Sequence, residues 1–404
     1  MPHLRSRYLV ESIKKAMTSA PIVGLMGQRQ VGKTTLASLL GREYVTLDIR
    51  NNLEVCENDP ELFLKNRKHP FVIDESQMSP ALFPALKEAV RLLPKPGQYI
   101  ITGSVRFSSR KQIRESLTGR ISVLELLPMS ITETHGEPLN ALPLIAMAGA
   151  KTLQRFLPTL ARERRPEVWQ KRIDTHIKLG GLPGVCFARD QNIRNQKLES
   201  YLETILLRDL QLIVQTTLAY SNLKNLVAQI ALKQSEPVDF SELARQTGIS
   251  TITVKKLLAA LQGLYLIREI PGLGDIKKSC FYLEDSGLAQ HLMSGWQNPR
   301  QDLFRLLHAN LRQQFYGRLE LGMATQVFHY QTRGGASVPL VFRTPKGTIA
   351  YSGILERQVT SSVLLSAKSF LKKFPQSIVF IAHQGAEIRQ WDAHIWGVPL
   401  RLVL

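Results

Sequence analysis

The eight residues Gly27–Thr34 (GQRQVGKT) constrain this chain more than any other part of its sequence. They fit the pattern GxxxxGK[ST], in which glycines allow the backbone to wrap closely around phosphate oxygens. The apolar run Ile22–Met26 before them predicts a buried strand, and Thr35–Leu40 after them predicts a helix that Gly41 ends. Strand, tight loop and helix in this order predict a phosphate-binding loop, because the backbone N–H groups at a helix start favour anions.

Each polar residue of this loop has an expected role. Lys33 would reach the β- and γ-phosphates of a nucleotide, and the Thr34 hydroxyl would ligate Mg²⁺. A chance match in an ordinary strand–turn–helix is the alternative, and the flanking strand and helix argue against it. The residues expected to bind the nucleotide are Gly27, Gln28, Arg29, Gln30, Val31, Gly32, Lys33, Thr34 and Thr35.

A second motif, Phe71–Glu75 (FVIDE), is an apolar strand that ends in two acids. Asp74 suits a Mg²⁺ partner, and Glu75 beside it can polarise a water for in-line attack on a γ-phosphate. The acidic pair favours hydrolysis of ATP, because no acceptor site of a small-molecule kinase and no base-reading motif of a GTPase is evident. The alternative is a strand followed by an exposed acidic turn.

A third strand is expected at Tyr99–Thr102, and polar residues at its end are candidates for sensing the γ-phosphate. Thr102 and Ser104 are these candidates, and Ser104 joins the expected nucleotide-binding set. Three arginines follow, and one of them could act as an arginine finger on the chain's own ATP or on that of a neighbouring subunit. They are Arg106, Arg114 and Arg120, of which Arg120 is the preferred catalytic candidate. A basic surface helix is the alternative.

With these motifs the chain resembles the prokaryotic AAA-type P-loop ATPases that carry a C-terminal domain of unknown function. The resemblance implies a five-stranded parallel sheet flanked by helices, and a helical lid with a Gly-x-Pro element at Gly181–Pro183. Arg120 matches the Gly-Arg motif of the family and Arg208–Asp209 its Arg-Asp motif, so either arginine could contact nucleotide or a neighbouring domain. Further matching segments are Tyr44–Ile49, Val72–Gln77, Ile101–Ser104, Glu115–Ser130, Gly180–Val185 and Tyr201–Leu210.

The segment Asp239–Leu261 has the pattern of a helix-turn-helix, with apolar residues at helical spacing on both sides of a turn at Gly248–Ser250. Strands at Leu264–Ile270 and Ser279–Leu283 could complete a winged helix. If this unit reads double-stranded DNA, the start of the second helix would enter the major groove. The expected contacts are Ser250, Thr251, Thr253, Lys255 and Lys256. A packing module or a protein contact is the alternative.

The last part of the chain resembles a PD-(D/E)xK nuclease whose metal site has degenerated. Pro339 stands where the family has the metal-binding Asp, and Gln358 stands where it has the Lys that follows Glu356 by two residues. Arg312 occupies a position that commonly carries an acid. One carboxylate holds a catalytic Mg²⁺ poorly, so we expect a nuclease-like shape without nuclease chemistry. The gained arginine would suit binding of a phosphate backbone without cleavage.

Composition narrows the class of protein. Of the 404 residues 44% are apolar and 21% charged, which excludes disorder as the main state. The net charge of +19 suggests a polyanionic partner, but residues 1–165 hold 24 basic and 15 acidic residues and the rest hold 28 and 18, so it belongs to folded surface. Three scattered cysteines exclude a disulfide framework, and the nine histidines show no metal-ligand spacing. No signal peptide or membrane span is expected, and the predicted location is cytoplasmic.

The sequence thus predicts four units: an ATPase core at 1–150, a helical lid at 151–232, a winged helix at 233–283 and a degenerate nuclease-like domain at 284–404. The predicted function is Mg²⁺-dependent ATP hydrolysis that drives a conformational switch coupled to DNA binding. One alternative is a slow nucleotide-gated switch for a protein partner or self-association, and another is an ATP-dependent enzyme with an active C-terminal nuclease. The predicted cofactors are ATP and Mg²⁺.

Overall fold

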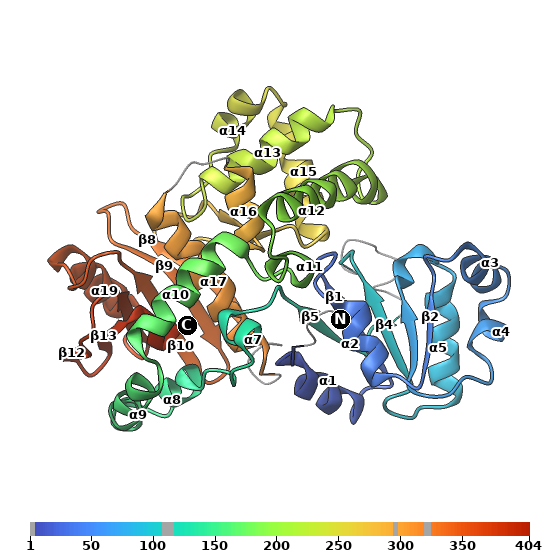
Figure 1. Ribbon diagram of the computed structural model, residues 1–404, viewed down its shortest axis with the longest axis horizontal. Helices are drawn as coiled ribbons and strands as arrows, with labels where there is room; N and C mark the ends of the chain where they lie inside the picture. Colours follow the sequence, from blue (N-terminus) through green and yellow to red (C-terminus); the bar gives the residue numbers. More distant parts are fainter. Residues whose placement is uncertain (1–4, 107–116, 294–297, 319–324) are drawn as a thin grey trace.

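The computed structural model describes residues 5–106, 117–293, 298–318 and 325–404. Two β-sheets lie at opposite ends of the chain, and helices join them (Figure 1). The N-terminal sheet, drawn in blue and cyan, has five strands, and the C-terminal sheet, drawn in orange and red, has six. The predicted α/β class is therefore confirmed. Among the described residues, no helix combines the length and the apolar character needed to cross a membrane.

The N-terminal sheet is parallel, with the strand order β2-β3-β4-β1-β5. Its strand β4 lies between β3 and β1, the two strands that carry the predicted motifs. Both faces are covered, which explains the nearly continuous apolar runs of β1 and β3. The strands are β1 (Ile22–Gly27), β2 (Glu43–Thr46), β3 (Phe71–Asp74), β4 (Tyr99–Gly103) and β5 (Ile121–Leu126).

Alternate residues of these strands enter two separate cores, as the two-residue period of a strand requires. Ile22 and Met26 of β1 pack on one face with α3, α4 and α5, whereas Val23 and Leu25 pack on the other with α1 and α2. The helices are α1 (Leu9–Met17), α2 (Lys33–Leu40), α3 (Arg50–Asn58), α4 (Pro60–Leu64), the short helix η1 (Ser76–Met78) and α5 (Leu82–Leu92).

The helices after β5 divide between two cores. Those from α7 to α10 share a core with the C-terminal sheet, whereas α12 and α13 share one with α14 and α15. The helix α9, which the sequence assigned to the lid, therefore packs on the C-terminal sheet. The elements are α7 (Ile131–His135), α8 (Leu142–Met147), α9 (Ala150–Glu163), α10 (Pro166–Leu179), α11 (Pro183–Cys186), α12 (Gln191–Glu203), η3 (Thr204–Asp209), η4 (Leu210–Leu212) and α13 (Tyr220–Leu232).

Two helices and two antiparallel strands follow where the sequence placed them: α14 (Phe240–Thr247), α15 (Thr251–Gly263), β6 (Ile267–Ile270) and β7 (Cys280–Leu283). A winged-helix identity for this unit remains a prediction. The loop between β6 and β7, which was expected to be the wing, lies against strand β8. Its Leu273 N–H donates to the His329 carbonyl at 2.8 Å, and its Asp275 N–H donates to the Gln331 carbonyl at 2.9 Å. These backbone groups are therefore engaged within the protein.

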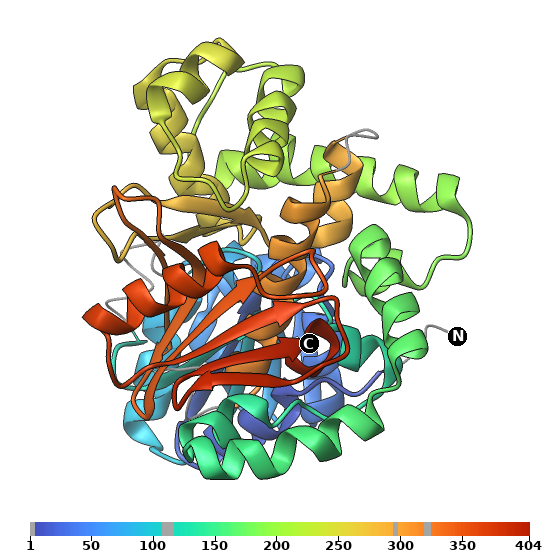
Figure 2. The same ribbon diagram turned by 90° about the vertical axis from the view of Figure 1, so that its left-hand side faces the viewer.

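The C-terminal sheet is mixed, with the order β12-β13-β11-β10-β9-β8. Helix α17 covers one face and α19 the other, as Figure 2 shows from the side of this sheet. The elements are α16 (Ser286–Leu292), α17 (Pro299–Tyr316), β8 (Gln326–Gln331), β9 (Ser337–Thr344), β10 (Gly347–Gly353), α19 (Ser361–Lys373), β11 (Ile378–His383), β12 (Arg389–Asp392), β13 (Ile395–Pro399) and α20 (Leu400–Val403).

Two expectations about this C-terminal part are corrected. Strand β10 ends at Gly353, so Glu356 lies beyond the strand that was expected to carry it. Arg312 on α17 has only 1% of its side chain exposed and pairs with Glu284, so it offers no charge to a phosphate backbone. A nuclease-like identity for this part remains a prediction.

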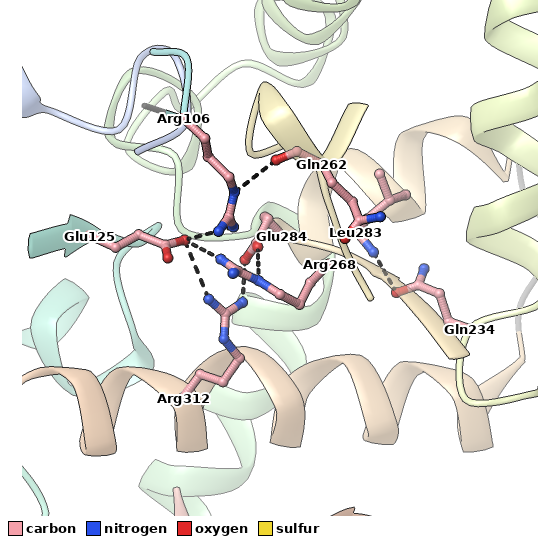
Figure 3. Close-up of polar contacts among 8 residues, drawn as sticks. All are labelled: Arg106, Glu125, Gln234, Gln262, Arg268, Leu283, Glu284 and Arg312. Atoms are coloured by element: carbon pink, nitrogen blue, oxygen red, sulfur yellow. Dashed lines mark hydrogen bonds and ion pairs between the residues drawn. The ribbon is translucent and has the colours of Figure 1, made fainter. Parts of the chain in front are cut away.

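Arg312 belongs to a buried cluster of five charged side chains, which we call the Glu125–Glu284 cluster (Figure 3). Glu125 of β5 accepts from Arg268 of β6, and it lies 3.5 Å from Arg312 and 3.8 Å from Arg106. Glu284, which follows β7, pairs with Arg268 at 2.8 Å and also with Arg312. The cluster thus ties the parallel sheet, the β6–β7 unit and α17 together.

Substitution of Glu284 by Gln should destabilise the protein, because Arg268 and Arg312 would lose a buried counter-charge. The expected loss in the free energy of unfolding is about 3–5 kcal/mol at pH 7. A fall in the urea midpoint, followed by far-UV circular dichroism, would measure it. The matched control Glu88→Gln removes an exposed carboxylate paired with Arg91, and it should leave the midpoint unchanged.

The same substitution should remove part of the acid sensitivity. Burial opposes ionisation of Glu284, but Arg268 and Arg312 outweigh it and hold its pKa below the usual value. A depressed carboxyl pKa stabilises the fold above the unfolded-state pKa of about 4.3 and loses that contribution as the pH falls below it. The difference in urea midpoint between the two proteins should therefore shrink from pH 7 to pH 3. A constant difference would contradict this assignment.

Candidate functional site

The phosphate-binding loop has the backbone geometry that its glycines predicted. Gly27 at the end of β1 has φ = 151°, and a Cβ atom there would lie 2.3 Å from the Leu126 carbonyl oxygen. Gly32 has φ = 99° immediately before α2 begins at Lys33. Residues other than glycine rarely adopt either backbone conformation. Both glycines are therefore required for the sharp turn from β1 into α2.

Lys33 lies fully inside this loop. Its ammonium group donates to the carbonyls of Gly27 at 3.0 Å and Gln28 at 2.9 Å. Burial lowers the pKa of Lys33 to about 8, although the negative charges of Glu75 and Asp74 oppose the shift. The loop thus holds a cation that is incompletely neutralised, which is the electrostatic condition for binding phosphate.

Asp74 is the centre of a hydrogen-bond network at the carboxyl end of β3. Its carboxylate accepts from the Thr34 hydroxyl at 2.8 Å, the Tyr44 hydroxyl at 2.8 Å, and also the Thr102 hydroxyl. The structure therefore brings Thr34 and Asp74 into contact, as the magnesium prediction required. A hydroxyl oxygen and a carboxylate oxygen are ligands that Mg²⁺ prefers. Sequence reasoning did not find Tyr44, because a lone tyrosine on a strand gives no signal of this contact.

Glu75 stands next to this network in a left-handed backbone conformation, with φ = 52°. Its N–H donates to the Thr102 hydroxyl at 3.2 Å, and its carboxylate accepts from Gln77 and from Ser104 at 3.4 Å. Strain of this kind in a residue other than glycine is concentrated at functional sites. Both predicted sensor residues, Thr102 and Ser104, thus contact the acidic pair Asp74–Glu75.

A cavity of about 600 Å³ lies over the loop. Its floor is formed by the loop and Glu75, and its other wall by α11 and the residues around it. Pro183 of the Gly-x-Pro element lies against Gly32, since a Cβ atom on Gly32 would be 3.9 Å from the proline ring. The residues lining the cavity are Gln30, Gly32, Lys33, Thr34, Thr35, Glu75, Pro183, Gly184, Phe187, Ala188 and Lys197.

Arg7 is a second residue that sequence reasoning missed. Its guanidinium donates to the carbonyls of Val31 at 2.9 Å and Leu127 at 2.5 Å, and to the buried carboxylate of Glu133 at 3.2 Å. It therefore fixes the loop to the segment that follows β5. The sequence showed only an isolated N-terminal arginine, because its partners lie far along the chain.

The positions of Arg120 and Arg106 correct their expected role toward the chain's own ATP, whereas a contact with the ATP of a neighbouring subunit stays a prediction. Arg120 precedes β5, and its carbonyl accepts from the Ile22 N–H at the amino end of β1. Because β1 and β5 are parallel, Arg120 lies at the amino ends of these strands, whereas Gly27 lies at the carboxyl end of β1. Five residues of strand separate the two ends by about 16 Å. Arg120 therefore cannot reach the chain's own nucleotide.

Arg106 also points away from the cavity. It donates to the Gln262 carbonyl at 3.0 Å and stacks over the Tyr265 ring at 4.4 Å. It therefore connects the end of β4 to the end of α15, and it is not a finger on the chain's own nucleotide. Arg114 lies outside the described residues.

The five predicted DNA contacts gather at the start of α15, but several of them have partners within the protein. The Ser250 hydroxyl accepts from the Thr253 N–H at 3.2 Å, and so caps the helix. Lys255 lies 5.2 Å from the Phe240 ring centroid. Lys256 is exposed, and Thr251 is partly exposed. The structure therefore leaves only a small basic face on this helix.

Two parts of the chain are similar to known protein families. Residues 19–135 match the model of a family described as an AAA domain. This part of the chain is therefore similar to AAA domains, which are P-loop ATPases. Residues 170–300 match a domain described only as one of unknown function.

Two uncharacterized proteins, one from Mycobacterium tuberculosis and one from Mycobacterium bovis, are 28% identical over 291 residues. The match covers 70% of this chain and only 58% of the length of each relative. Among solved structures, a Walker-type ATPase of Pyrococcus abyssi is 15% identical, with a TM-score of 0.40, and 70% of this chain and 94% of that chain are covered. A signal transduction ATPase with a tetratricopeptide repeat sensor, from Pyrococcus horikoshii, is 14% identical with a TM-score of 0.27, over 77% and 47% of the two chains.

The lowered pKa of Lys33 predicts that nucleotide binding takes up a proton at alkaline pH. Above about pH 8 the free side chain is largely neutral, whereas bound phosphates favour its charged form. The affinity for ATP should therefore fall by up to about tenfold per pH unit above pH 8. Calorimetry at pH 8.5 in buffers of different ionisation enthalpy would measure the proton uptake. Binding without uptake would contradict the assigned role of Lys33.

Proposed function

We propose that this chain binds ATP with Mg²⁺ and hydrolyses it to ADP and phosphate. The observation that supports this most is the convergence of Lys33, Thr34, Asp74 and Glu75 at one end of the parallel sheet, beside one cavity. The phosphates would lie along the loop. The base and ribose would extend toward α11, between the start of α2 and Phe187.

The roles follow from the contacts. The Thr34 hydroxyl and the Asp74 carboxylate would hold Mg²⁺, which when bound offsets phosphate charge. Lys33 stabilises the charge that develops on the phosphate oxygens. Glu75 orients a water and accepts its proton as the water oxygen bonds to the γ-phosphorus and the bond to the ADP oxygen breaks. Gln77 and Ser104 hold the Glu75 carboxylate in place.

Substitution of Glu75 by Gln should separate binding from turnover. The amide cannot accept the proton, so the rate of phosphate release should fall by about 10²–10⁴-fold while ATP still binds. Lys33→Ala should abolish both. The exposed carboxylate of Glu88 provides the control Glu88→Gln, which should behave like the unsubstituted protein. Turnover retained in both site variants would refute the assignment.

Binding of double-stranded DNA is a second candidate output. It is favoured by the exposed face of α15, where Ile252 has 69% of its surface accessible beside Lys255 and Lys256. Apolar and basic side chains together at the start of such a helix suit base methyl groups and phosphates. The docked β6–β7 loop argues against a second contact through a wing.

The test for this candidate is the ATPase rate with double-stranded and with single-stranded DNA across a salt series. If α15 contacts phosphates, the double variant Lys255→Ala, Lys256→Ala should make the plot of log binding constant against log salt concentration less steep. Its slope should fall in magnitude by about two. A rate indifferent to DNA and binding without a salt slope would leave a nucleotide-gated protein switch as the output. Magnesium-dependent cleavage of DNA that is lost in Glu356→Ala would instead support an active nuclease.

A further inference from the structure

One ion pair joins the phosphate-binding loop to the helices above it. The Arg29 guanidinium lies 3.3 Å from the Asp209 carboxylate, and the two side chains are 22% and 4% exposed. Asp209 is the last residue of η3, a π-helical turn, Thr204–Asp209, that continues α12. Such wide turns are rare and often occur at functional sites. The pair therefore links the loop to residues 183–209, which we call the α11–η3 segment.

Arg29 immediately precedes Gln30, which lines the cavity over the loop. The charges of both Glu75 and Asp209 act on Lys33 and raise its pKa, while the charge of Arg29 lowers it. Glu75 in turn raises the pKa of Asp209. Arg29 and Asp209 are thus close to the two residues assigned to the terminal phosphate.

The negative charge of Asp209 would be unfavourable beside a bound nucleotide. Burial raises its pKa above the usual value, although Arg29 and Arg208 oppose the shift. A terminal phosphate would add further negative charge beside it. An arginine can bind a phosphate through two parallel hydrogen bonds, and a terminal phosphate carries more negative charge than a carboxylate does. Arg29 therefore has a stronger partner available when ATP is present.

Apolar side chains of the α11–η3 segment pack in the core that also contains α13 and α15, whereas its polar contacts to the loop are few among the described residues. The amide of Gln28 and the hydroxyl of Tyr201 are buried and lie close to each other at this contact. The other ion pair at this contact joins Arg208 to Asp48 at 3.6 Å, and about half of each side chain is exposed. An exposed pair contributes little. The Arg29–Asp209 pair is therefore more buried than the Arg208–Asp48 pair.

We propose that Asp209 is a stand-in for the terminal phosphate of ATP and competes with it for Arg29. This proposal rests on ATP being the ligand of the loop. In the nucleotide-free protein Asp209 holds Arg29 and ties the α11–η3 segment to the loop. ATP transfers Arg29 to its γ-phosphate and releases the end of η3 from the loop. ADP, which lacks that phosphate, leaves the pair intact. The pair thereby makes the segment respond to ATP and not to ADP.

The first experiment measures the affinities for the β,γ-imido analogue of ATP and for ADP, with Mg²⁺ at constant ionic strength. Asp209→Asn should tighten binding of the analogue roughly tenfold and change ADP binding less than about twofold, because one buried negative charge near the γ-phosphate is removed. Arg29→Ala should weaken binding of the analogue and not of ADP. The control Glu199→Gln removes a carboxylate of α12 that bonds Lys224 and His291, away from the loop, and should change neither affinity.

The second experiment follows hydrogen exchange of residues 204–209 in the unsubstituted protein, so it does not depend on a variant that folds. Exchange should accelerate when the analogue is added and not when ADP is added. Equal effects of Asp209→Asn on both nucleotides, or exchange that slows with the analogue, would overturn the competition. If the unsubstituted protein binds neither nucleotide, the proposed ATPase function fails instead.

Discussion

The Glu125–Glu284 cluster is the interaction on which the relation between the parts of this chain depends. Two buried carboxylates meet guanidinium groups from the β4 end, β6 and α17, so three parts of the fold share one set of charges. Each group would be unfavourable in the interior without the others. The cluster therefore requires these parts to remain in contact. Its three arginines pair with carboxylates inside the fold, although the sequence alone would assign such basic residues to the surface.

The nucleotide site lies beside this fixed framework. Ser104 contacts Glu75, Val105 packs into the core that contains α12 and α15, and Arg106 reaches the end of α15. Three consecutive residues thus run from the carboxylate of Glu75 to the helical region. Tyr265 of that region packs in return into a core of the parallel sheet. A change at Glu75 has a short physical route to α15 through packed side chains, whereas the Arg29–Asp209 ion pair joins the loop to the end of η3.

The net charge of +19 has a different meaning once the partners are known. Arg7 and Arg312 are buried, Arg268 is partly buried, and all three are paired. Lys33 belongs to the phosphate loop. Lys233 and Lys278 pair with Glu242 and Asp239 beside the helix-turn-helix. The loop that was expected to be a wing is docked on β8. The charge that remains free near α15 is small, so the excess of basic residues supports a polyanionic partner less than composition suggested.

The sequence by itself determined the loop, the acidic strand end and the neighbouring sensor strand, because each is a short motif whose local geometry follows from glycine, apolar periodicity and polar strand ends. The parallel sheet brings Thr34, Asp74, Glu75, Thr102 and Ser104 together. Only the tertiary structure decided which distant charges meet. Arg7 with Glu133, Arg29 with Asp209 and Arg312 with Glu284 are separated by 126, 180 and 28 residues. No periodicity or spacing encodes such pairs, since electrostatic partners are selected by burial and proximity after the chain has folded.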